Sequence, residues 1–419
     1  MDGITSRART VNGVPTSLLD LGYSDVGLDD AWQVCGENGM LKYTYHDTAG
    51  NPIVDENLFP DMKAMNDYAH DKGLTTGWYG NNCICKDHCM TDSCYENDVK
   101  ALVDFGFDGV KLDNCGKQLD LQKWSDLMDA ASPDKPLMIE NCHWGLTTPT
   151  ADGWCPFNFY RSSMDVRASY DSVIANLMST SSFAAANLSY PGCWAYPDGL
   201  EIGIKDGPGG ANDPGLTFNE ARTHFGGWCI VSSPLVLEFD TTDDVVVDEI
   251  WPIVSNSEAI AVNQAYAGES GALFASSTEK VLLNLWTRDD SAHAQANVSD
   301  AEVIAANPLG GIFSDNINNL SFKKEILVGS WQQWSKLLDD KSAAVLVINN
   351  GDAAQEVVVD FASIPSLKRM GGESNSSCGK YYMRDIWAHN DLPAISSGSW
   401  MVQLDSHDSA FVLLTSTCV

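Results

Sequence analysis

The chain has 419 residues, of which 44% are hydrophobic and 20% are charged. This length and composition predict two or three domains, or one large barrel with an appendage, and argue against wholesale disorder. The formal net charge of −32 repels phosphate backbones and anionic lipids. We therefore expect no nucleic-acid partner and no membrane attachment. No apolar run reaches the roughly 18 residues that a membrane-spanning helix needs.

Up to about residue 265, short apolar runs alternate with helical segments. The predicted strands are 23–28, 75–79, 109–113, 137–141, 159–161 and 235–237, and the predicted helices are 62–72, 95–105, 121–131, 169–178 and 219–230. Such alternation is typical of parallel strands joined by crossover helices. The number of repeats favours a (β/α)8 TIM barrel over an open doubly wound sheet, and no G-x-G-x-x-G motif follows a strand.

From about residue 266 the pattern changes to short apolar or alternating runs separated by turn signals. The predicted strands here are 281–286, 343–348, 356–361, 400–404 and 410–414. This pattern is typical of a β-sandwich. We therefore predict an α/β protein with a catalytic barrel over residues 1–265 and a C-terminal antiparallel β-sandwich over residues 266–419.

The cysteines indicate an oxidising compartment. The chain has 12 cysteines, and four of them crowd into one segment: Cys83, Cys85, Cys89 and Cys94. Such a cluster could hold zinc in a reducing compartment, but its spacing favours disulfides. Sequons for N-glycosylation occur at Asn187, Asn297, Asn319 and Asn375. We expect a secreted or lysosomal/vacuolar glycoprotein whose true N-terminus is absent, because residues 1–13 have no signal-peptide core.

Polar residues cluster where the predicted strands end, and this is where barrels carry their active sites. Lys111 and Asp113 are two residues apart, so they share one face of a strand and the lysine keeps the carboxylate ionised. Asp165 supplies a second carboxyl group, and Arg161 supplies a cation that can bind hydroxyls. Two carboxyl groups in the company of tryptophans are the equipment of glycoside hydrolysis.

These segments resemble glycoside hydrolase family 27, the family of α-galactosidases and α-N-acetylgalactosaminidases. The resemblance is carried by GLDDAW (27–32), DGVKLDNC (108–115), CHWG (142–145), YRSSMDV (160–166), CWAYPDGLEIG (193–203), SSPLVL (232–237), AVNQ (261–264) and RDIWAHNDL (384–392). It implies a (β/α)8 barrel followed by an antiparallel β-sandwich. It also implies a retaining mechanism that uses no metal and no cofactor.

The resemblance implies a role for each candidate residue. Asp113 is expected to be the nucleophile and Asp165 the general acid/base. The expected substrate-binding residues are Asp29, Asp30, Lys111, Arg161, His143, Trp78 and Trp194. Within that set, Asp29 and Asp30 would bind the axial 4-hydroxyl and the 6-hydroxyl of galactose, and Lys111 and Arg161 would bind hydroxyls near the 2- and 3-positions.

The resemblance also implies two disulfides, Cys83–Cys115 and Cys142–Cys155. It leaves open the pairing of Cys35, Cys85, Cys89, Cys94, Cys193, Cys229, Cys378 and Cys418.

The chain departs from the family pattern at three places. The family opens with a strand carrying a G-W-N-S-W-like motif, so the first barrel strand is expected to be missing from this chain. His143 stands where a C-E-W-G-like motif has its glutamate, and the segment 77–83 lacks the aspartate that is usual there. Members that act on N-acetylgalactosamine tend to carry small residues at the position of His143, so its bulk argues against that substrate.

The leading hypothesis is an exo-acting, retaining α-galactosidase that removes terminal α-D-galactosyl residues from oligosaccharides or glycoconjugates. The alternatives are a β-L-arabinopyranosidase, an α-N-acetylgalactosaminidase and an inactive, truncated sugar-binding homologue. Asp29 and Asp30 together favour galactose, and the presence of both Asp113 and Asp165 argues against an inactive protein. A homodimer is the candidate oligomeric state.

Overall fold

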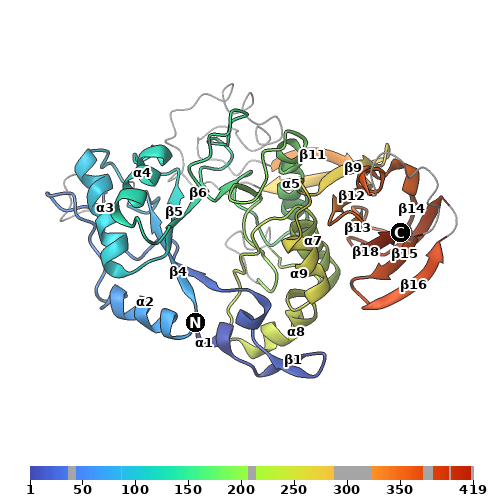
Figure 1. Cartoon of the computed structure of the whole chain (residues 1–419), viewed down its shortest axis with the longest axis horizontal. Helices are drawn as coiled ribbons and strands as arrows, with labels where there is room; N and C mark the ends of the chain where they lie inside the picture. Colours follow the sequence, from blue (N-terminus) through green and yellow to red (C-terminus); the bar gives the residue numbers. More distant parts are fainter. Residues whose placement is uncertain are drawn as a thin grey trace. The chain divides into compact units, whose positions relative to one another are not determined.

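The structure, a computed structural model of the whole chain, describes residues 1–35, 44–85, 87–205, 214–286, 323–370, 381–395 and 398–416. The described residues form two compact units (Figure 1). The first unit runs from Met1 to Arg161, and the second contains the described residues from Ser162 onward. The predicted strand–helix region is thus divided between the units, and the predicted β-sandwich lies in the second.

The first unit is built around a parallel sheet. The strands of this sheet that lie within the unit are β3 (Asp25–Gly27), β4 (Thr75–Gly80), β5 (Gly109–Asp113), β6 (Met138–Cys142) and β7 (Phe159–Arg161). They pair in chain order, with Tyr79 opposite Lys111 and Asp113 opposite Cys142. The C-terminal ends of the strands therefore meet along one edge, as in the predicted (β/α) barrel.

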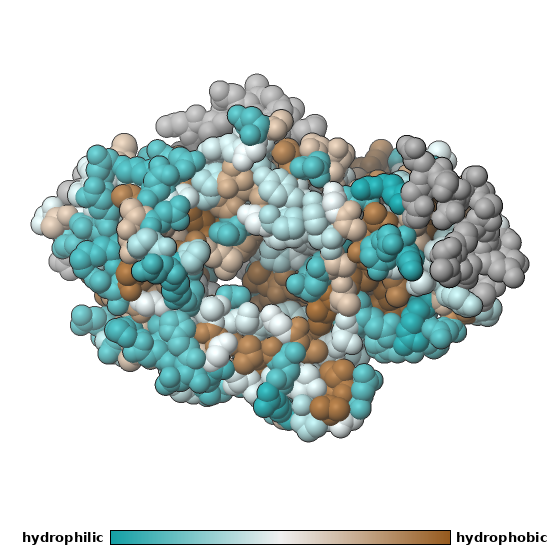
Figure 2. Space-filling model, in the orientation of Figure 1, coloured by the Kyte–Doolittle hydropathy of each residue, from teal (hydrophilic) through white to brown (hydrophobic). Residues whose placement is uncertain are grey.

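Three helices connect these strands: α2 (Met62–Asp71), α3 (Asp92–Phe105) and α4 (Leu121–Ala131). Local signals set their ends. The Asp61 side chain accepts a hydrogen bond from Ala64 N at the start of α2, and Gly106 ends α3 with a φ of 86°. The helices α2 and α3 turn a hydrophilic face to the surface that Figure 2 shows, as amphipathic helices do.

The N-terminal segment of the first unit folds separately from the sheet. It contains α1 (Asp2–Thr5), the hairpin of β1 (Arg9–Val11) and β2 (Val14–Thr16), and the short 3-10 helix η1 (Leu19–Leu21). Asn12 and Gly13 connect the hairpin with φ values of 52° and 79°. Two successive positive φ values match the twist of a two-residue hairpin turn, and asparagine followed by glycine is the pair best suited to them.

Disulfides tie the first unit together. They join Cys35 to Cys85, Cys83 to Cys115 and Cys89 to Cys94. The crowded segment 83–94 therefore holds disulfides, as its spacing predicts, and the expected Cys83–Cys115 bond is among them. Cys378 and Cys418 lie outside the described residues, as do the sequons at Asn297, Asn319 and Asn375, whereas Asn187 is exposed.

The second unit begins with further strand and helix elements. These are α5 (Tyr170–Ser179), α6 (Ser181–Ala185), β8 (Trp194–Tyr196), α7 (Phe218–Ile230), α8 (Asp244–Val254) and α9 (Ser257–Gln264). A capping box of Thr217 and Glu220 starts α7. The predicted strand 235–237 is wrong, because this short run after Pro234 forms only an isolated bridge between Leu237 and Leu200.

The rest of the second unit is antiparallel β-structure. Its strands are β9 (Ala272–Ser276), β10 (Lys280–Trp286), β11 (Lys323–Gly329), β12 (Trp331–Leu337), β13 (Ser342–Asn349), β14 (Gln355–Asp360), β15 (Tyr381–Asp385), β16 (Asn390–Ile395), β17 (Ser399–Leu404) and β18 (Ser409–Ser416). Six strands form one sheet in the order β16-β15-β18-β13-β12-β9, and β10–β11 and β14–β17 form two further pairs. Valines of β13 and β14 pack in a common core with the 3-10 helix η4 (Phe361–Ser363) and α11 (Pro365–Arg369), which confirms the predicted sandwich.

Charged and aromatic side chains join α7 to the sandwich within the second unit. Arg222 forms an ion pair with Asp408, with an N–O distance of 2.5 Å. His407 lies 2.7 Å from the Glu220 carboxylate, and its ring stacks on Tyr170 with the centroids 3.9 Å apart. None of the helices in the described parts of the chain is long and apolar enough to cross a membrane.

Candidate active site

Asp113 is the last residue of β5, and its carboxylate is fixed from several sides. The side chain is buried, and Oδ2 accepts a hydrogen bond of 2.6 Å from the Tyr79 hydroxyl. Oδ1 accepts a second bond of 2.6 Å from Asn114 N. The Cys142 sulfur lies 3.8 Å from Oδ2. The Tyr79 and Asn114 donors fix the orientation of the Asp113 carboxylate, as the nucleophile of a retaining glycosidase requires.

Lys111 stands on the same face of β5 as Asp113, as the spacing predicts. Its ammonium group forms an ion pair of 2.7 Å with Asp29 and lies 5.6 Å from the ring centroid of Tyr79. Asp29 is exposed, whereas Lys111 is half-buried. The structure thus brings together Asp29, Lys111 and Asp113, and adds Tyr79, which no sequence motif indicated.

Asp30 has a different position from its neighbour Asp29. Oδ2 of Asp30 accepts hydrogen bonds from Cys83 N at 3.0 Å and Ile84 N at 2.8 Å. Oδ1 accepts from Ala31 N at 2.9 Å and from the Gln33 side chain. Because a carboxylate has about four acceptor positions, these bonds already engage Asp30 fully. It anchors the segment after β4, and it is less available to a sugar hydroxyl than the resemblance implies.

The expected disulfide between Cys142 and Cys155 is wrong. Cys142 is a buried free thiol, and Cys155 is bonded in another disulfide. The register of β6 places Cys142 opposite Asp113, and its sulfur accepts a hydrogen bond of 3.4 Å from Arg161. Burial and the nearby charge of Asp113 raise the pKa of the Cys142 thiol well above its usual value, so the group stays protonated.

His143 is held by the segment that follows β6. Its Nδ1 lies 2.9 Å from the Thr147 hydroxyl, and its backbone N–H donates to the Asn141 side chain. Burial lowers the pKa of His143 to about 4, so the ring is neutral. Nε2 is buried and has no hydrogen-bond partner among the described residues.

Trp78 lies away from this cluster. Successive residues of a strand point to opposite faces, so Trp78 faces away from Tyr79 and Asp113. It packs against Trp32 at 4.7 Å and Phe107 at 6.0 Å between ring centroids. The structure therefore gives Trp78 a place in an aromatic core, and Tyr79 is the aromatic residue beside the carboxylate. Alternation along β4 combined with the register against β5 is the signal that points to Tyr79.

Asp165 and Trp194 belong to the second unit. Asp165 is exposed in the segment after β7, and its sequence neighbours take part in hydrogen bonds that help to fix this segment. Val166 N donates to Asp198 at 2.8 Å, and the Asn176 side chain donates to the Met164 carbonyl at 2.9 Å. Trp194, at the start of β8, is half-buried and meets Tyr266 edge-on. The second carboxyl group is thus on an exposed, locally anchored loop.

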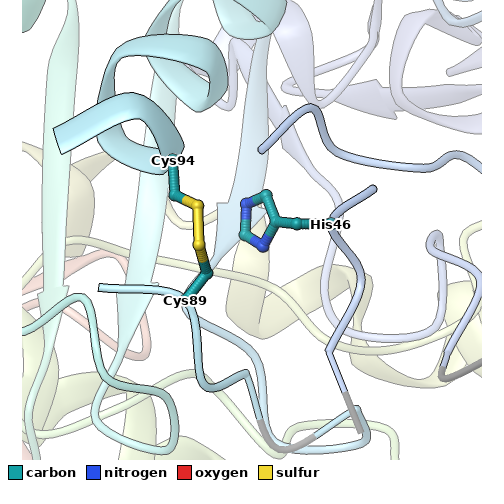
Figure 3. A group of neighbouring side chains, drawn as sticks. All are labelled: His46, Cys89 and Cys94. Carbon is teal, nitrogen blue, oxygen red and sulfur yellow. A yellow bond between two sulfur atoms is a disulfide. The ribbon is translucent and has the colours of Figure 1, made fainter. Parts of the chain in front are cut away.

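Two groups among the described residues have metal-ligating side chains within reach of one another. They are His46 with Cys89 and Cys94, and Asp113 with Cys83 and Cys115. Figure 3 shows the His46 ring beside the Cys89–Cys94 disulfide. In both groups the two sulfurs are bonded to each other, so they are not the thiolates that bind zinc. We assign neither group to a metal.

Family models match both parts of the chain. A model described as alpha galactosidase A matches residues 14–265, and one described as the alpha galactosidase C-terminal beta sandwich domain matches residues 328–414. An α-galactosidase of Cyamopsis tetragonoloba is 30% identical over 409 residues, which cover 96% of this chain and 79% of that protein.

Solved structures share the fold at low sequence identity. One is an α-galactosidase of Saccharomyces cerevisiae with raffinose, with a TM-score of 0.65 and 17% identity over 96% of this chain and 91% of that one. Another is a β-L-arabinopyranosidase of Geobacillus stearothermophilus, with a TM-score of 0.66 and 17% identity over 96% and 90% of the two chains. These likenesses confirm the predicted fold of barrel and sandwich.

Proposed function

Because the chain belongs to glycoside hydrolase family 27, we propose that it is a retaining exo-α-galactosidase acting on terminal α-D-galactosyl residues. The observation that carries the proposal is the Asp113 carboxylate, buried at the end of β5 and oriented by Tyr79 and Asn114. The raffinose bound to the yeast relative supports galactose-containing oligosaccharides as the substrate class.

The two carboxyl groups divide the work of a double displacement. Asp113 attacks the anomeric carbon while Asp165 gives its proton to the departing glycosidic oxygen. The galactose is then bound to the enzyme through the Asp113 oxygen. Asp165, now a carboxylate, takes a proton from water, which attacks the same carbon and releases Asp113. Two inversions leave the product in the α-configuration. The exposure of Asp165 suits a group that must meet both an aglycone and water.

The surroundings of Asp113 suggest how galactose is recognised. The ion pair of Asp29 and Lys111 offers an acceptor and a donor to hydroxyl groups beside the nucleophile. His143 offers its neutral ring through Nε2. The bulk of this ring argues against the acetamide of N-acetylgalactosamine. Arg161 is buried and donates a hydrogen bond to the Cys142 sulfur, so we assign it to the same group of polar side chains around Asp113. Trp194 stays a predicted contact of the substrate.

The test is a set of nitrophenyl glycosides: α-galactoside, β-L-arabinopyranoside, α-N-acetylgalactosaminide and α-glucoside. We expect kcat/KM to be highest for the α-galactoside, lower for the arabinopyranoside, and negligible for the α-glucoside, whose 4-hydroxyl is equatorial. The Asp113→Asn variant is the matched control, because it keeps size and burial and removes the nucleophile. Comparable rates on α-glucoside, or activity that persists in Asp113→Asn, would overturn the proposal.

The location and the domain boundary are proposed on separate grounds. The disulfides of the first unit support folding in an oxidising compartment, so we propose a secreted or lysosomal/vacuolar protein. The match to the first family model ends at residue 265, and the match to the second begins at residue 328. These limits support a division into a catalytic barrel over 1–265 and a sandwich over 266–419.

A further inference from the structure

The side chain of Asn81 connects the end of β4 to the nucleophile. Asn81 is the first residue after β4 and is fully buried. Its Nδ2 donates a hydrogen bond of 2.5 Å to the main-chain carbonyl of Asp113, and its Oδ1 accepts one of 2.9 Å from Gln118 N. One amide therefore holds both ends of the segment 113–118, which leads away from the nucleophile.

The backbone of Asn81 is engaged as well. Its N–H donates to the Tyr45 hydroxyl at 3.4 Å, and its carbonyl accepts from Gly116 N at 3.0 Å. The φ of Asn81 is 55°, in the left-handed region that glycine and asparagine adopt at the lowest cost. All four polar groups of this residue are thus bonded, and the backbone conformation aims the amide at Asp113.

Gly116 makes room for this amide. A Cβ at Gly116 would lie 2.0 Å from Asn81 Oδ1 and 3.1 Å from the Asp87 side chain. The distance to Asn81 Oδ1 is far inside van der Waals contact, and the distance to Asp87 is a few tenths of an ångström too short. The glycine is needed because the segment after Asp113 passes directly over the Asn81 side chain.

A buried polar network supports the segment from the other side. The Gln118 side chain donates to Asp98 at 2.7 Å, and Asp98 is bound at 2.9 Å by His46. Burial alone would lower the pKa of His46, but Asp98 and Asp87 raise it to about 10, so the ring carries a charge. The His46 ring, drawn in Figure 3, forms ion pairs with the two buried carboxyl groups of Asp87 and Asp98. Asn81 is therefore connected through Gln118 to a buried network of hydrogen-bonded and charged side chains.

We propose that Asn81 is a positioning residue for the nucleophile. By fixing the Asp113 carbonyl and the segment 114–118, it sets the direction in which the Asp113 carboxylate leaves the main chain. A carboxylate displaced by a fraction of an ångström attacks the anomeric carbon less effectively, while sugar binding changes little. The inference rests on the proposed function, because only there is Asp113 a nucleophile.

The test replaces Asn81 by glycine, which accepts the left-handed backbone without strain and removes only the amide. The matched control is Asn12→Gly, which has a φ of 52° in an exposed turn of the same unit. We expect kcat of Asn81→Gly on the nitrophenyl α-galactoside to fall by about 10- to 100-fold. KM and the inhibition constant for galactose should stay within about twofold, as expected for an effect on positioning alone. Asn12→Gly should change neither.

A second variant approaches the same contact from the other side. Gly116→Ala keeps the Asn81 amide but pushes it away, so it should lower kcat with the same small effect on galactose binding. Covalent trapping separates chemistry from product release: a 2,2-difluoro-α-galactoside with a good leaving group should inactivate both variants more slowly at saturation. Circular dichroism checks that each variant is folded at the assay temperature.

The outcomes separate this inference from the proposed function. A wild-type chain that cleaves none of the galactosides overturns the proposed function and this inference with it. An active wild type whose kcat is unchanged in Asn81→Gly overturns the inference alone. A loss of galactose binding as large as the loss of kcat also overturns it, because it indicates a general collapse of the site. A fall in kcat and in the trapping rate in both variants, with galactose binding kept, supports it.

Discussion

The two carboxyl groups proposed for catalysis differ in burial between the two units. Asp113 is buried, and its own oxygens accept hydrogen bonds from Tyr79 and Asn114. Asp165 is exposed, and Val166 and Met164 on either side of it take part in hydrogen bonds that help to fix its segment. The contrast follows the chemistry: a nucleophile gains from a fixed line of attack, whereas an acid/base must meet both an aglycone and water.

Buried asparagine side chains serve both units in spite of this contrast. Asn81 donates to the carbonyl of Asp113 itself, and Asn176 donates to the carbonyls of Met164 and Pro197. In the first unit the asparagine amide is hydrogen-bonded to the proposed catalytic residue itself. In the second unit it is hydrogen-bonded to Met164, the residue before the proposed acid/base, and to Pro197. We therefore expect side-chain changes near Asp113 to affect the rate, and those near Asp165 to affect stability first.

The largest expected effects come from removing each carboxyl group. Asp113→Ala should lose activity to background and form no covalent intermediate. Asp165→Ala should lose about 10²–10⁴-fold on substrates with poor leaving groups. With a very good leaving group it should still release a burst of phenolate and then stall. Mass spectrometry of the stalled enzyme should detect one added galactosyl group.

The stereochemistry of the reaction checks the same assignment in the unaltered enzyme. Proton NMR of the first-formed sugar should detect the α-anomer. A β-anomer appearing first, or a burst in Asp113→Ala, would show that the roles of the two residues are assigned wrongly.

An intermediate effect is expected from Tyr79→Phe and Asn176→Ala, taken as a pair. Tyr79→Phe removes a 2.6 Å donor from the nucleophile. Loss of such a charge-assisted bond costs about 1–3 kcal/mol, so kcat should fall by roughly 10- to 100-fold. Asn176→Ala removes the hydrogen-bond donor of the Met164 and Pro197 carbonyls and should lower the free energy of unfolding by about 1–3 kcal/mol, with a smaller change in kcat. A loss of stability without a loss of kcat in Tyr79→Phe, or a loss of kcat without a loss of stability in Asn176→Ala, would contradict the contrast between the two units.

The smallest expected effect is a difference in acid stability between the units. Burial lowers the pKa of His143 from 6.5 to about 4, so between those values the unfolded chain binds a proton that the folded chain does not. The free energy of unfolding therefore falls as the pH drops through this window. His143→Gln should reduce that fall. A variant as acid-sensitive as the wild type would contradict the assignment of a buried neutral ring.

His407, in the second unit, should behave in the opposite sense. Burial alone would lower its pKa, but Glu220 outweighs this and raises it. The folded state then holds the proton more tightly than the unfolded state. The resulting stabilisation is complete below the unfolded pKa near 6.5 and is lost as the pH rises through the folded pKa. In urea titrations, His407→Gln should therefore lose less stability above pH 6.5 than the wild type.

Helix ends and the faces of single strands could be predicted from the sequence because their signals are local. Asp61 caps α2 at the start of the predicted helix 62–72, and β5 covers the predicted residues 109–113. The strand β12 was missed because Gln332 and Lys336 interrupt its apolar pattern. Lys336 is nevertheless buried, because it donates to the carbonyls of Val262 and Asn263, and partners this distant in the sequence leave no local signal.

The same reason explains which parts of the site were missed. Lys111 and Asp113 follow from the two-residue period of a strand. The choice of Tyr79 over Trp78 depends on the register between β4 and β5, and the engagement of Asp30 depends on the backbone of Cys83 and Ile84. The sequence could place polar residues at strand ends, but the pairing of those ends determines which of them meet.

The disulfides of the first unit also change what its unfolded state is. Cys83 and Cys85, separated by one residue, are bonded to Cys115 and Cys35 respectively. An unfolded but oxidised chain is therefore a branched polymer, with two closed loops meeting at one tripeptide. Such a chain exposes less surface and has less entropy than a linear one. The dependence of unfolding on denaturant concentration should then be shallower in the oxidised protein. Variants can be ranked for stability only when their redox state is the same.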